Sequence, residues 1–383
     1  MVTQGENLLR LNYPLRELSF KLGSVLLGVV VALLLAELGL RVKFGGSWNL
    51  KQEQSERINE DVSFFEYDET LGWKGKAFAS GVQHGKNFSI SVRFNSQGLR
   101  AREVPYKKME GKIRILVLGD SQTWGSSVEQ GERFTEILED LLHRRGINAE
   151  VLNFGVVGYG TDQELLLFNR LGIRYHPDLV IVGFFWNDLF ENSIPVAYGY
   201  PKPQFVPGPT STLQLRNIPV PKKIGQKKEF AGNRRGNVWD ATKSWLAANS
   251  YIYRVLADAV RRSPFLYQFA VETKIAGGPW RDPDSREWKI TKSLLEMLKE
   301  TVKESGSDFL VAIIPERADF ETAIYSFKHR LIDEMRDFPS IDLLPALKAV
   351  GPASKLYYSN DIHLKPAGHR AIGQAIFEYL MQR

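Results

Sequence analysis

The 383-residue chain contains no cysteine, only six histidines and no internal repeat. Without cysteine it has no disulfide framework, no thiolate zinc site, no iron–sulfur cluster and no cysteine nucleophile. The missing cysteines leave the cellular compartment open, because such a chain tolerates oxidising and reducing surroundings alike. Any chemistry that uses histidine has few candidate residues.

Charge of one sign is not in large excess either. The chain has 50 lysines and arginines against 44 aspartates and glutamates, and the formal net charge of +6 is spread along it. So mild an excess indicates a solvated surface, and nucleic acid is not an expected partner. With 43% hydrophobic and 25% charged residues, the composition excludes wholesale disorder. The length suits one large domain or two modest ones.

One long hydrophobic run is present near the start. Leu22 to Ala36 reads LGSVLLGVVVALLLA, and Glu37 is the only ionisable residue between Lys21 and Arg41. As a helix, residues 22–40 would span about 28 Å, close to the thickness of a bilayer core. We therefore predict a retained single-pass membrane anchor over residues 22–40, preceded by an N-terminal tail, residues 1–21.

Two alternatives to the anchor stay open. A cleaved signal peptide needs a small-residue cleavage site after its apolar core, and AELGLRVKF is a poor one. A buried core helix usually keeps a polar stripe, which Val25 to Leu35 lacks.

The positive-inside rule does not decide the orientation of this segment, because basic residues flank both ends. They are Arg10, Arg16 and Lys21 on one side and Arg41, Lys43, Lys51 and Arg57 on the other. A short N-terminal tail ahead of a signal-anchor helix commonly stays in the cytoplasm. We expect the large domain to be extracytoplasmic, either periplasmic or extracellular.

The remainder divides into a lead-in and a main domain. Residues 41–110 are predicted to be a polar linker and a small β-rich segment, with alternating runs such as 88–94. Residues 111–383 form the main domain. Its predicted strands are 113–118, 150–154, 178–185 and 308–314, and helical periodicity covers 131–145 and 162–171. Strands alternating with helices predict an α/β fold with a parallel sheet covered on both faces.

An insertion at about 195–300 interrupts this rhythm. Residues 195–240 are rich in proline and carry a basic cluster from Lys222 to Arg235, whereas 241–272 and 286–304 are predicted to be helical. The proline-rich part is typical of a surface excursion or a lid. The basic cluster is interpreted as solvated, with contact to an anionic polymer or lipid head groups as the alternative.

Polar signatures follow three predicted strands, where ligands bind in open parallel sheets. Gly119-Asp120-Ser121 follows the first strand and leads into a helix. The glycine-rich stretch 153–160 follows the second, where Gly158 allows close approach of a backbone N–H. Asn187-Asp188 follows the third, and the Asn187 amide is a hydrogen-bond donor. Each signature alone is more typical of a turn or a helix cap.

Asp361 and His363 lie together on a loop just before the last predicted helix. A carboxylate can orient the far nitrogen of a histidine base, and a serine hydroxyl needs such a base to act as a nucleophile. Donors at Ser121, Gly158 and Asn187 would then stabilise a tetrahedral oxyanion.

The four signatures in this order resemble the SGNH/GDSL hydrolase family. Its blocks are matched by LVLGDSQTWGSSV, LNFGVVGYGT, the Asn187-Asp188 pair and DIHLKPAGH. The resemblance covers 113–190 and 308–383, and it implies a flavodoxin-like three-layer α/β/α fold. It also implies Ser121 as nucleophile, His363 as base, and Ser121, Gly158 and Asn187 as the oxyanion hole.

Two positions depart from the family pattern. Its last block often reads Asp-x-x-His, but here Asp361 stands two residues before His363 and Asn360 three before. Related polysaccharide acetyl-transfer enzymes use Asp-x-His, so Asp361 is the predicted orienting acid. Gln122 stands where related membrane-anchored members often carry an aromatic residue, and we expect it to alter the pocket wall.

These features together predict a membrane-anchored serine esterase. Its expected substrates are O-acyl esters, O-acetyl esters among them, of a glycan or lipid, and no metal or organic cofactor is expected. One alternative is a polysaccharide O-acyltransferase that uses the same site. The other is a catalytically silent binding or assembly component of the cell envelope. The sequence does not identify protein partners.

Overall fold

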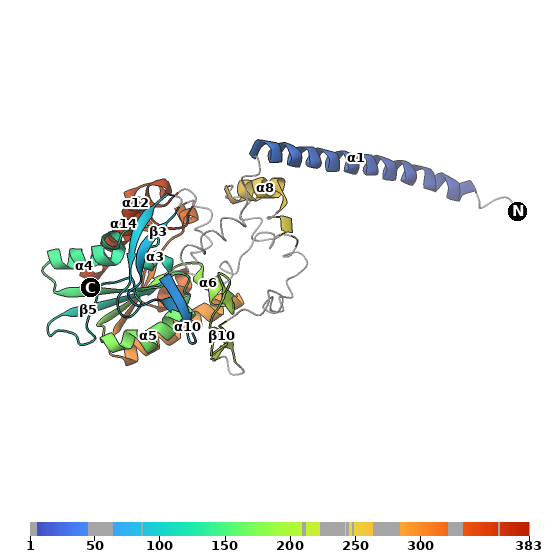
Figure 1. Cartoon of the computed structure of the whole chain (residues 1–383). Helices are drawn as coiled ribbons and strands as arrows, with labels where there is room; N and C mark the ends of the chain where they lie inside the picture. Colours follow the sequence, from blue (N-terminus) through green and yellow to red (C-terminus); the bar gives the residue numbers. More distant parts are fainter. Residues whose placement is uncertain are drawn as a thin grey trace. The chain divides into compact units, whose positions relative to one another are not determined.

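The structure is a computed structural model. It describes residues 6–44, 64–85, 87–208, 212–222, 242, 245–246, 249–262, 284–320, 332–358 and 361–382. The contacts group two helices, α1 (Glu6–Phe44) and α8 (Tyr251–Arg262), in one compact unit and the remaining elements in a second. Figure 1 shows the course of the whole chain.

A five-stranded parallel sheet forms the centre of the larger unit. The strands are β5 (Ile113–Gly119), β6 (Ala149–Gly155), β7 (Leu179–Phe184), β12 (Asp308–Ile313) and β13 (Ser340–Asp342). Their spatial order is β13-β12-β7-β5-β6. Numbered along the chain, this is the 2-1-3-4-5 order of flavodoxin-like folds. The predicted α/β fold with a parallel sheet is confirmed.

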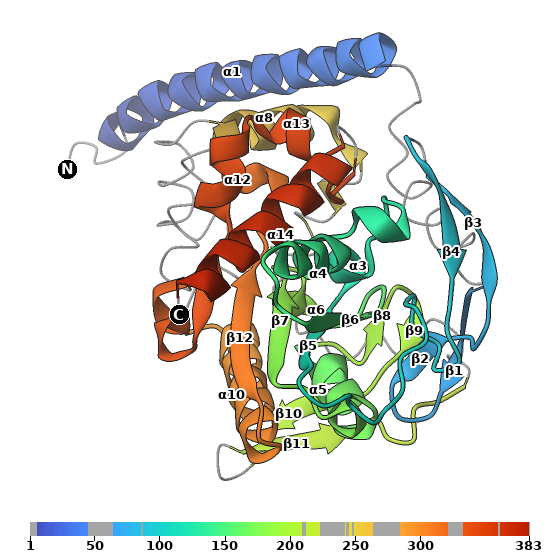
Figure 2. The ribbon, with the colours of Figure 1, turned by 90° about the vertical axis from the view of Figure 1, so that its left-hand side faces the viewer.

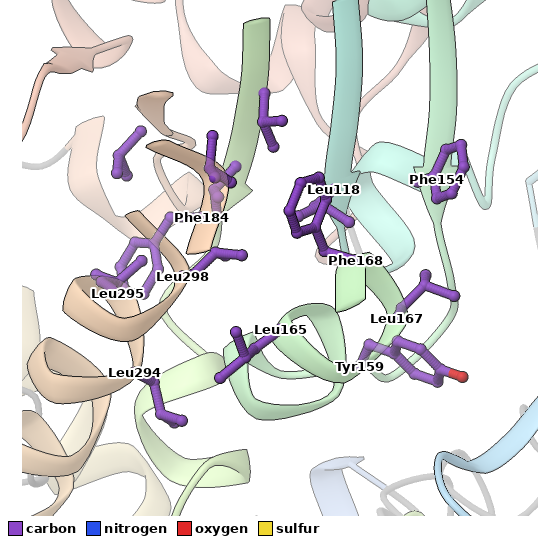
Figure 3. Packing of buried hydrophobic residues seen from close by; sticks show 14 of the residues in the cluster. Leu118, Phe154, Tyr159, Leu165, Leu167, Phe168, Phe184, Leu294, Leu295 and Leu298 are labelled. Atoms are coloured by element: carbon purple, nitrogen blue, oxygen red, sulfur yellow. The ribbon is translucent and has the colours of Figure 1, made fainter. Parts of the chain in front are cut away.

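Helices cover both faces of this sheet because its strands are apolar on both sides. In β5, Ile115 and Val117 face one core cluster and Leu116 and Leu118 face the other. The first cluster lies under α4 (Phe134–Arg144), α12 (Leu344–Val350), α13 (Ala353–Leu356) and α14 (Pro366–Met381). The second lies under α5 (Thr161–Arg170) and α10 (Arg286–Glu304) (Figures 2 and 3). The result is the expected three-layer α/β/α arrangement.

Four of the five strands match predicted strands to within one or two residues at each end. The exception is β13, which the sequence analysis missed because it has only three residues, and an alternation cannot be recognised over so short a length. The predicted helices 131–145, 162–171 and 286–304 correspond to α4, α5 and α10.

Short antiparallel hairpins surround the sheet. In the lead-in, β1 (Phe65–Asp68) pairs with β2 (Gly72–Gly75) and β3 (Ser80–His84) pairs with β4 (Ser89–Arg93). After β7, β8 (Val196–Ala197) pairs with β9 (Tyr200–Pro201) and β10 (Gln204–Pro207) with β11 (Leu213–Arg216). The remaining short helices are α3 (Ser121–Trp124), α6 (Asp188–Glu191) and the 3₁₀ turns Gln130–Glu132, Gly172–Tyr175, Arg317–Phe320 and Met335–Asp337.

Only part of the predicted insertion belongs to the described residues. Its first part folds into the hairpins β8–β11, and its last part includes α10, which packs on the sheet as a covering helix. Of the basic cluster, Lys222 alone is described, and the rest lies outside the described residues. The domain boundaries themselves stay a prediction.

The helix α1 contains the hydrophobic run. Its segment Gly23–Lys43 has a mean hydropathy of 2.4, and none of it is buried. Within the described part of the chain it is the one helix long and apolar enough to cross a membrane. Membrane anchors and signal sequences share this length and composition.

Candidate active site

Three loops leave the sheet side by side at the carboxyl ends of β6, β5 and β7. Gly119 at the end of β5 is in register with Gly155 in β6 and Gly183 in β7. The chain runs from β5 to β6 on one side and then crosses to β7 on the other, so the topological switch point lies between β5 and β7. Open α/β sheets bind ligands at such a point. The loops that carry Ser121, Gly158 and Asn187 therefore start at one level of the sheet edge.

The turn that carries Ser121 is built by its two preceding residues. Gly119 has φ +155°, and a Cβ there would lie 2.0 Å from the Thr123 Oγ1, so a side chain does not fit. The Asp120 carboxylate then accepts the Gln122 N–H at 2.8 Å and caps the short helix α3. Ser121 is the first residue of α3 and is 8% exposed.

His363 lies next to this serine. Its Nε2 is 2.8 Å from the Ser121 Oγ, and its Nδ1 is 2.6 Å from the Asp361 Oδ1. An ionised carboxylate can only accept a hydrogen bond, so the imidazole proton is assigned to Nδ1. The Nε2 lone pair is then free to accept the Ser121 hydroxyl proton. The structure thus brings Ser121, His363 and Asp361 into one hydrogen-bonded row.

The Asp-x-His spacing has a local explanation. The Asp361 Oδ1 accepts the backbone N–H of His363 at 3.1 Å as well as the imidazole N–H. Such a contact between residues i and i+2 is an Asx turn, which fixes the carboxylate close to its own backbone. A carboxylate two residues before the histidine therefore reaches both groups. Asn360 lies outside the described residues.

Two side chains from the serine segment hold the histidine loop. The Gln122 amide donates to the Ile362 carbonyl at 3.0 Å, and the Ser127 hydroxyl donates to the Leu364 carbonyl at 2.6 Å. These contacts bracket His363 on both sides. Gln122 is only 1% exposed, and its side chain joins two loops. The expectation that it alters the pocket wall stays a prediction.

Two backbone N–H groups fit the predicted oxyanion hole. Within the described residues, neither the Ser121 N–H nor the Gly158 N–H has a hydrogen-bond acceptor. Gly158 has φ +74°, and a Cβ there would lie 2.6 Å from the Tyr198 ring, so this position also requires glycine. Both donors are therefore available to a ligand.

The Asn187 amide has two hydrogen-bond acceptors. Its Nδ2 donates to the Asp120 Oδ2 at 3.1 Å and to the Glu191 Oε1 at 3.1 Å. The Glu191 Oε1 also accepts the Tyr198 hydroxyl. To donate to an oxyanion, Asn187 has to release one of its two carboxylate partners. Sequence reasoning missed Glu191 and Tyr198, because neither belongs to a family block.

The ionisation of Glu191 bears on this competition. Glu191 is 4% exposed, and burial raises the pKa of its carboxyl to about 8, although the Tyr198 and Asn187 hydrogen bonds favour the charged form. At neutral pH the carboxyl is mostly protonated. A neutral carboxyl accepts a weaker hydrogen bond than a carboxylate does, so Asn187 is then easier to release.

The lead-in contributes to the site through Trp73. Its indole N–H donates to the Val157 carbonyl at 2.9 Å, and its backbone carbonyl accepts the Tyr159 hydroxyl. Trp73 therefore holds the loop on both sides of Gly158. This role of Trp73 was not predictable from the sequence, because the lead-in lies outside the blocks of the resemblance.

Further carboxyl groups are buried behind Asn187. Asp162, Glu164 and Asp188 are each 0% exposed, and burial is the main cause that raises the pKa of all three. Asp162 pairs with the buried ammonium of Lys202. Neither oxygen of Glu164 has a partner within the described residues. This is the environment of a neutral acid, which neighbouring carboxylates make harder to ionise.

The described residues contain no group of three or more histidines or acids that could hold a metal ion. His369, the other histidine of the last block, is 1% exposed, and its Nδ1 accepts the Phe134 N–H at 3.3 Å. Burial lowers the pKa of His369 to about 3. It is a neutral core residue.

Comparisons with known proteins place the chain in a family. The profile of the family described as "GDSL-like Lipase/Acylhydrolase family" matches residues 117–371. No curated protein matches the chain.

Solved structures are similar at low sequence identity. The lipase/acylhydrolase from Enterococcus faecalis is 13% identical, with 71% of this chain and 96% of that chain covered and a TM-score of 0.37. The esterase EstA from Pseudoalteromonas sp. is 11% identical, with 70% and 97% covered and a TM-score of 0.35. Since the family profile spans more than half of the sequence, the chain belongs to the GDSL-like lipase/acylhydrolase (SGNH) family, whose members are serine hydrolases acting on ester bonds.

Proposed function

We propose that this protein is a membrane-anchored serine esterase that hydrolyses O-acyl esters of a glycan or lipid through an acyl-serine intermediate on Ser121. The observation that carries the proposal is the row from Asp361 to His363 to Ser121, with spacings of 2.6 and 2.8 Å. These spacings are within the reach that proton transfer requires.

The proposed reaction begins with His363. Its Nε2 takes the Ser121 hydroxyl proton as the Oγ attacks the ester carbonyl, and Asp361 stabilises the imidazolium that forms. The imidazolium then protonates the leaving alcohol, which leaves an acyl group on Ser121. A water molecule activated by the same imidazole resolves the acyl-enzyme. The carboxylic acid leaves, and the serine hydroxyl is restored.

The reaction also requires stabilisation of the negative charge that develops on the carbonyl oxygen. The N–H groups of Ser121 and Gly158 are free to receive it, and we propose the Asn187 amide as the third donor once Glu191 releases it. Removal of one oxyanion donor typically costs on the order of 100- to 1,000-fold in rate.

The helix α1 supports anchoring. Its apolar span of 21 residues suits the thickness of a bilayer, and none of it is buried. We propose that the span is retained and that the catalytic domain lies on the extracytoplasmic side. A domain held there meets ester groups on envelope glycans and on lipids.

A serine-directed probe tests the proposed function. Full-length protein in detergent or vesicles is treated with a fluorophosphonate and assayed on p-nitrophenyl acetate, beside the Ser121→Ala variant. We expect labelling and hydrolysis by the natural chain and neither by the variant. Absence of labelling in the folded natural chain would favour a silent envelope component.

A product that forms only when a sugar acceptor is present, and not with water, would identify an O-acyltransferase instead. The assay is therefore repeated with acetylated sugars as donors, with and without an unacetylated sugar. Release of acetate without the acceptor supports the esterase.

A further inference from the structure

The helix α8 presents an uncovered apolar side. At 100° per residue, Ile252, Val255, Leu256 and Ala259 fall along one side of it. Val255 is 40% exposed and Leu256 is 58% exposed. Trp245, which precedes the helix, is 63% exposed. An exposed apolar stripe on a strongly amphipathic helix indicates a surface that has a partner.

The glutamate of the hydrophobic run caps this helix. One Glu37 carboxylate oxygen accepts the Tyr251 N–H at 3.0 Å, and the other accepts the Ile252 N–H at 3.0 Å. The second oxygen also accepts the Ser250 hydroxyl at 3.0 Å. A carboxylate at the N-terminus of a helix satisfies its free N–H groups and interacts favourably with its dipole.

Arg41, one turn after Glu37, adds a second attachment. Its guanidinium donates to the Asn249 carbonyl at 2.6 Å and to the Glu37 carboxylate at 3.0 Å. The same group lies over the Tyr251 ring, 5.6 Å from its centroid. The beginning of α8 is thus held by two residues that are four positions apart on α1.

These two residues also fix the level at which α8 is attached. Glu37 and Arg41 lie in the last two turns of the apolar span Gly23–Lys43. If this span crosses a bilayer, its last turns lie at the boundary between acyl chains and head groups. Charged residues at this depth are rare and are normally paired, as Glu37 and Arg41 are.

We infer that α8 is an interfacial helix whose apolar side inserts into the lipid surface of the bilayer that α1 spans. The inference rests on the proposed anchor. We propose lipid as the occupant, because the lipid that surrounds the apolar span of α1 would also reach the apolar side of α8. The twelve residues of α8 include three arginines and one aspartate, which suits anionic head groups. Glu37 has a second role in this account, since it ties the interfacial helix to the spanning one.

The absence of cysteine makes a direct test possible, because a single introduced cysteine is the only labelling site. The full-length Leu256→Cys protein carries an environment-sensitive fluorophore and is reconstituted in vesicles that contain anionic lipid. Quenching by nitroxide lipids reports contact with the membrane, and quenching by iodide reports contact with water. The matched control is Asp258→Cys, a position that the helical repeat turns about 160° away. Met109→Cys, at an exposed position in the larger unit, is a second control.

We expect the Leu256 probe to emit at shorter wavelength, to be quenched by shallow nitroxide lipids and to be shielded from iodide, unlike the probe at position 258. Quenching by iodide and not by lipid would overturn the inference. Shielding from both quenchers would also overturn it, because a protein surface would then cover α8. If carbonate extracts the natural chain from the vesicles, α1 does not span the bilayer and the inference is overturned.

Glu37→Gln tests whether Glu37 attaches the beginning of α8 to α1. We expect this variant to stay in carbonate-washed vesicles and to lose most of the lipid quenching at position 256. Unchanged quenching would overturn the role of Glu37. Hydrolysis of p-nitrophenyl acetate by the same vesicles is measured in parallel. If the vesicles hydrolyse the ester but the probe at position 256 is exposed to water, this inference is wrong and the esterase proposal stands. If the probe lies in lipid but the ester is not hydrolysed, the esterase proposal is wrong and this inference stands.

Discussion

A serine hydroxyl is a weak nucleophile at neutral pH and needs a base to take its proton. In the folded chain, His363 and Asp361 of one loop lie in position for that task. Asp361 accepts both the imidazole and the backbone N–H of His363, so one carboxylate sets the tautomer and the position of the base. The Nε2 that remains faces the Ser121 Oγ at 2.8 Å. The roles follow from which atoms can donate and which can only accept.

Asp361→Asn tests this division of roles. The amide keeps the size of the side chain, but it can donate to Nδ1 and thus favour the wrong tautomer. We expect kcat for p-nitrophenyl acetate to fall on the order of 10⁴-fold, with the unfolding midpoint little changed. Asp140→Asn, at a side chain that is 70% exposed, is the control and is expected to be fully active. Equal activity of the two variants would exclude Asp361 as the orienting acid.

We predict that Glu191 is a positioning residue that acts through Asn187, and its raised pKa gives this prediction a pH signature. The charged groups around it are Asp120 and Lys202, and Tyr198 donates a hydrogen bond to it. Above a pH of about 8 the carboxyl ionises, holds the Asn187 amide more strongly and opposes the oxyanion charge. Activity is therefore expected to decline as the pH rises through about 8.

The variants Glu191→Gln and Tyr198→Phe test this signature. Glu191→Gln should lose the alkaline decline in kcat/KM. Tyr198→Phe removes a hydrogen bond that favours the charged form, so the decline should move to higher pH. The measurement is a pH–rate profile from pH 6 to about 10, where an ester that hydrolyses slowly without enzyme is used. Identical profiles for all three proteins would refute the role of Glu191.

Side-chain partnerships of this kind were not predictable from the sequence. The four family blocks predicted Ser121, Gly158, Asn187 and His363 as site residues, because each follows a strand or precedes a helix in a fixed order. Glu191 and Tyr198 carry no such pattern. Their contact with Asn187 depends on how the β8–β9 hairpin packs against α6, which local sequence does not reveal.

At the scale of elements, the active site is a junction between the helix α3 and the loop before α14. These segments are more than 200 residues apart, and the contacts from Gln122 and Ser127 hold them together across 240 and 237 positions. Since a general base has to stay within hydrogen-bond reach, the rate should depend on both contacts.

The double variant Gln122→Ala/Ser127→Ala measures this dependence. We expect kcat to fall roughly 100-fold, because a displacement of about 1 Å has that effect, while KM changes little. The kcat of each single variant should lie between that of the natural chain and that of the double variant. A lower fluorophosphonate labelling rate with an unchanged melting temperature would separate a loosened base from a loss of fold. An unchanged kcat in the double variant would show that the Gln122 and Ser127 contacts do not position His363.

The elements themselves were largely predictable. Continuous apolar runs such as 113–118 and 179–184 are long enough to be recognised, and their alternation with helical periodicity predicts a parallel sheet. The strand β13 is too short to recognise, and the role of Trp73 depends on a contact between the lead-in and the loop of Gly158. Local patterns therefore predicted the layers but not the support of the site.

At the scale of the whole molecule, the buried acids link stability to pH. Folding raises the pKa of Glu164 and Asp188 far above the usual range for carboxyls, so the folded state binds more protons than the unfolded state. The free energy of unfolding should therefore fall as the pH rises above about 4.5. Each such group contributes up to about 1.4 kcal/mol per pH unit.

Glu164→Gln isolates one of these groups. The variant keeps a neutral side chain of the same size, so we expect it to become more stable than the natural chain as the pH rises from 6 to about 8, by up to about 1.4 kcal/mol per pH unit. Urea unfolding midpoints at several pH values measure the difference. Parallel curves for the two proteins would show that Glu164 does not carry a raised pKa.

The proposed acyl-serine intermediate is a covalent bond on Ser121, and mass spectrometry of the trapped enzyme detects it. The full-length protein is mixed with a p-nitrophenyl ester, quenched in acid within the pre-steady state, digested and analysed. We expect an acyl adduct on the peptide that contains Ser121, and we expect it to form far more slowly in His363→Ala. An adduct on another residue, or fast turnover by Ser121→Ala, would contradict the proposed intermediate.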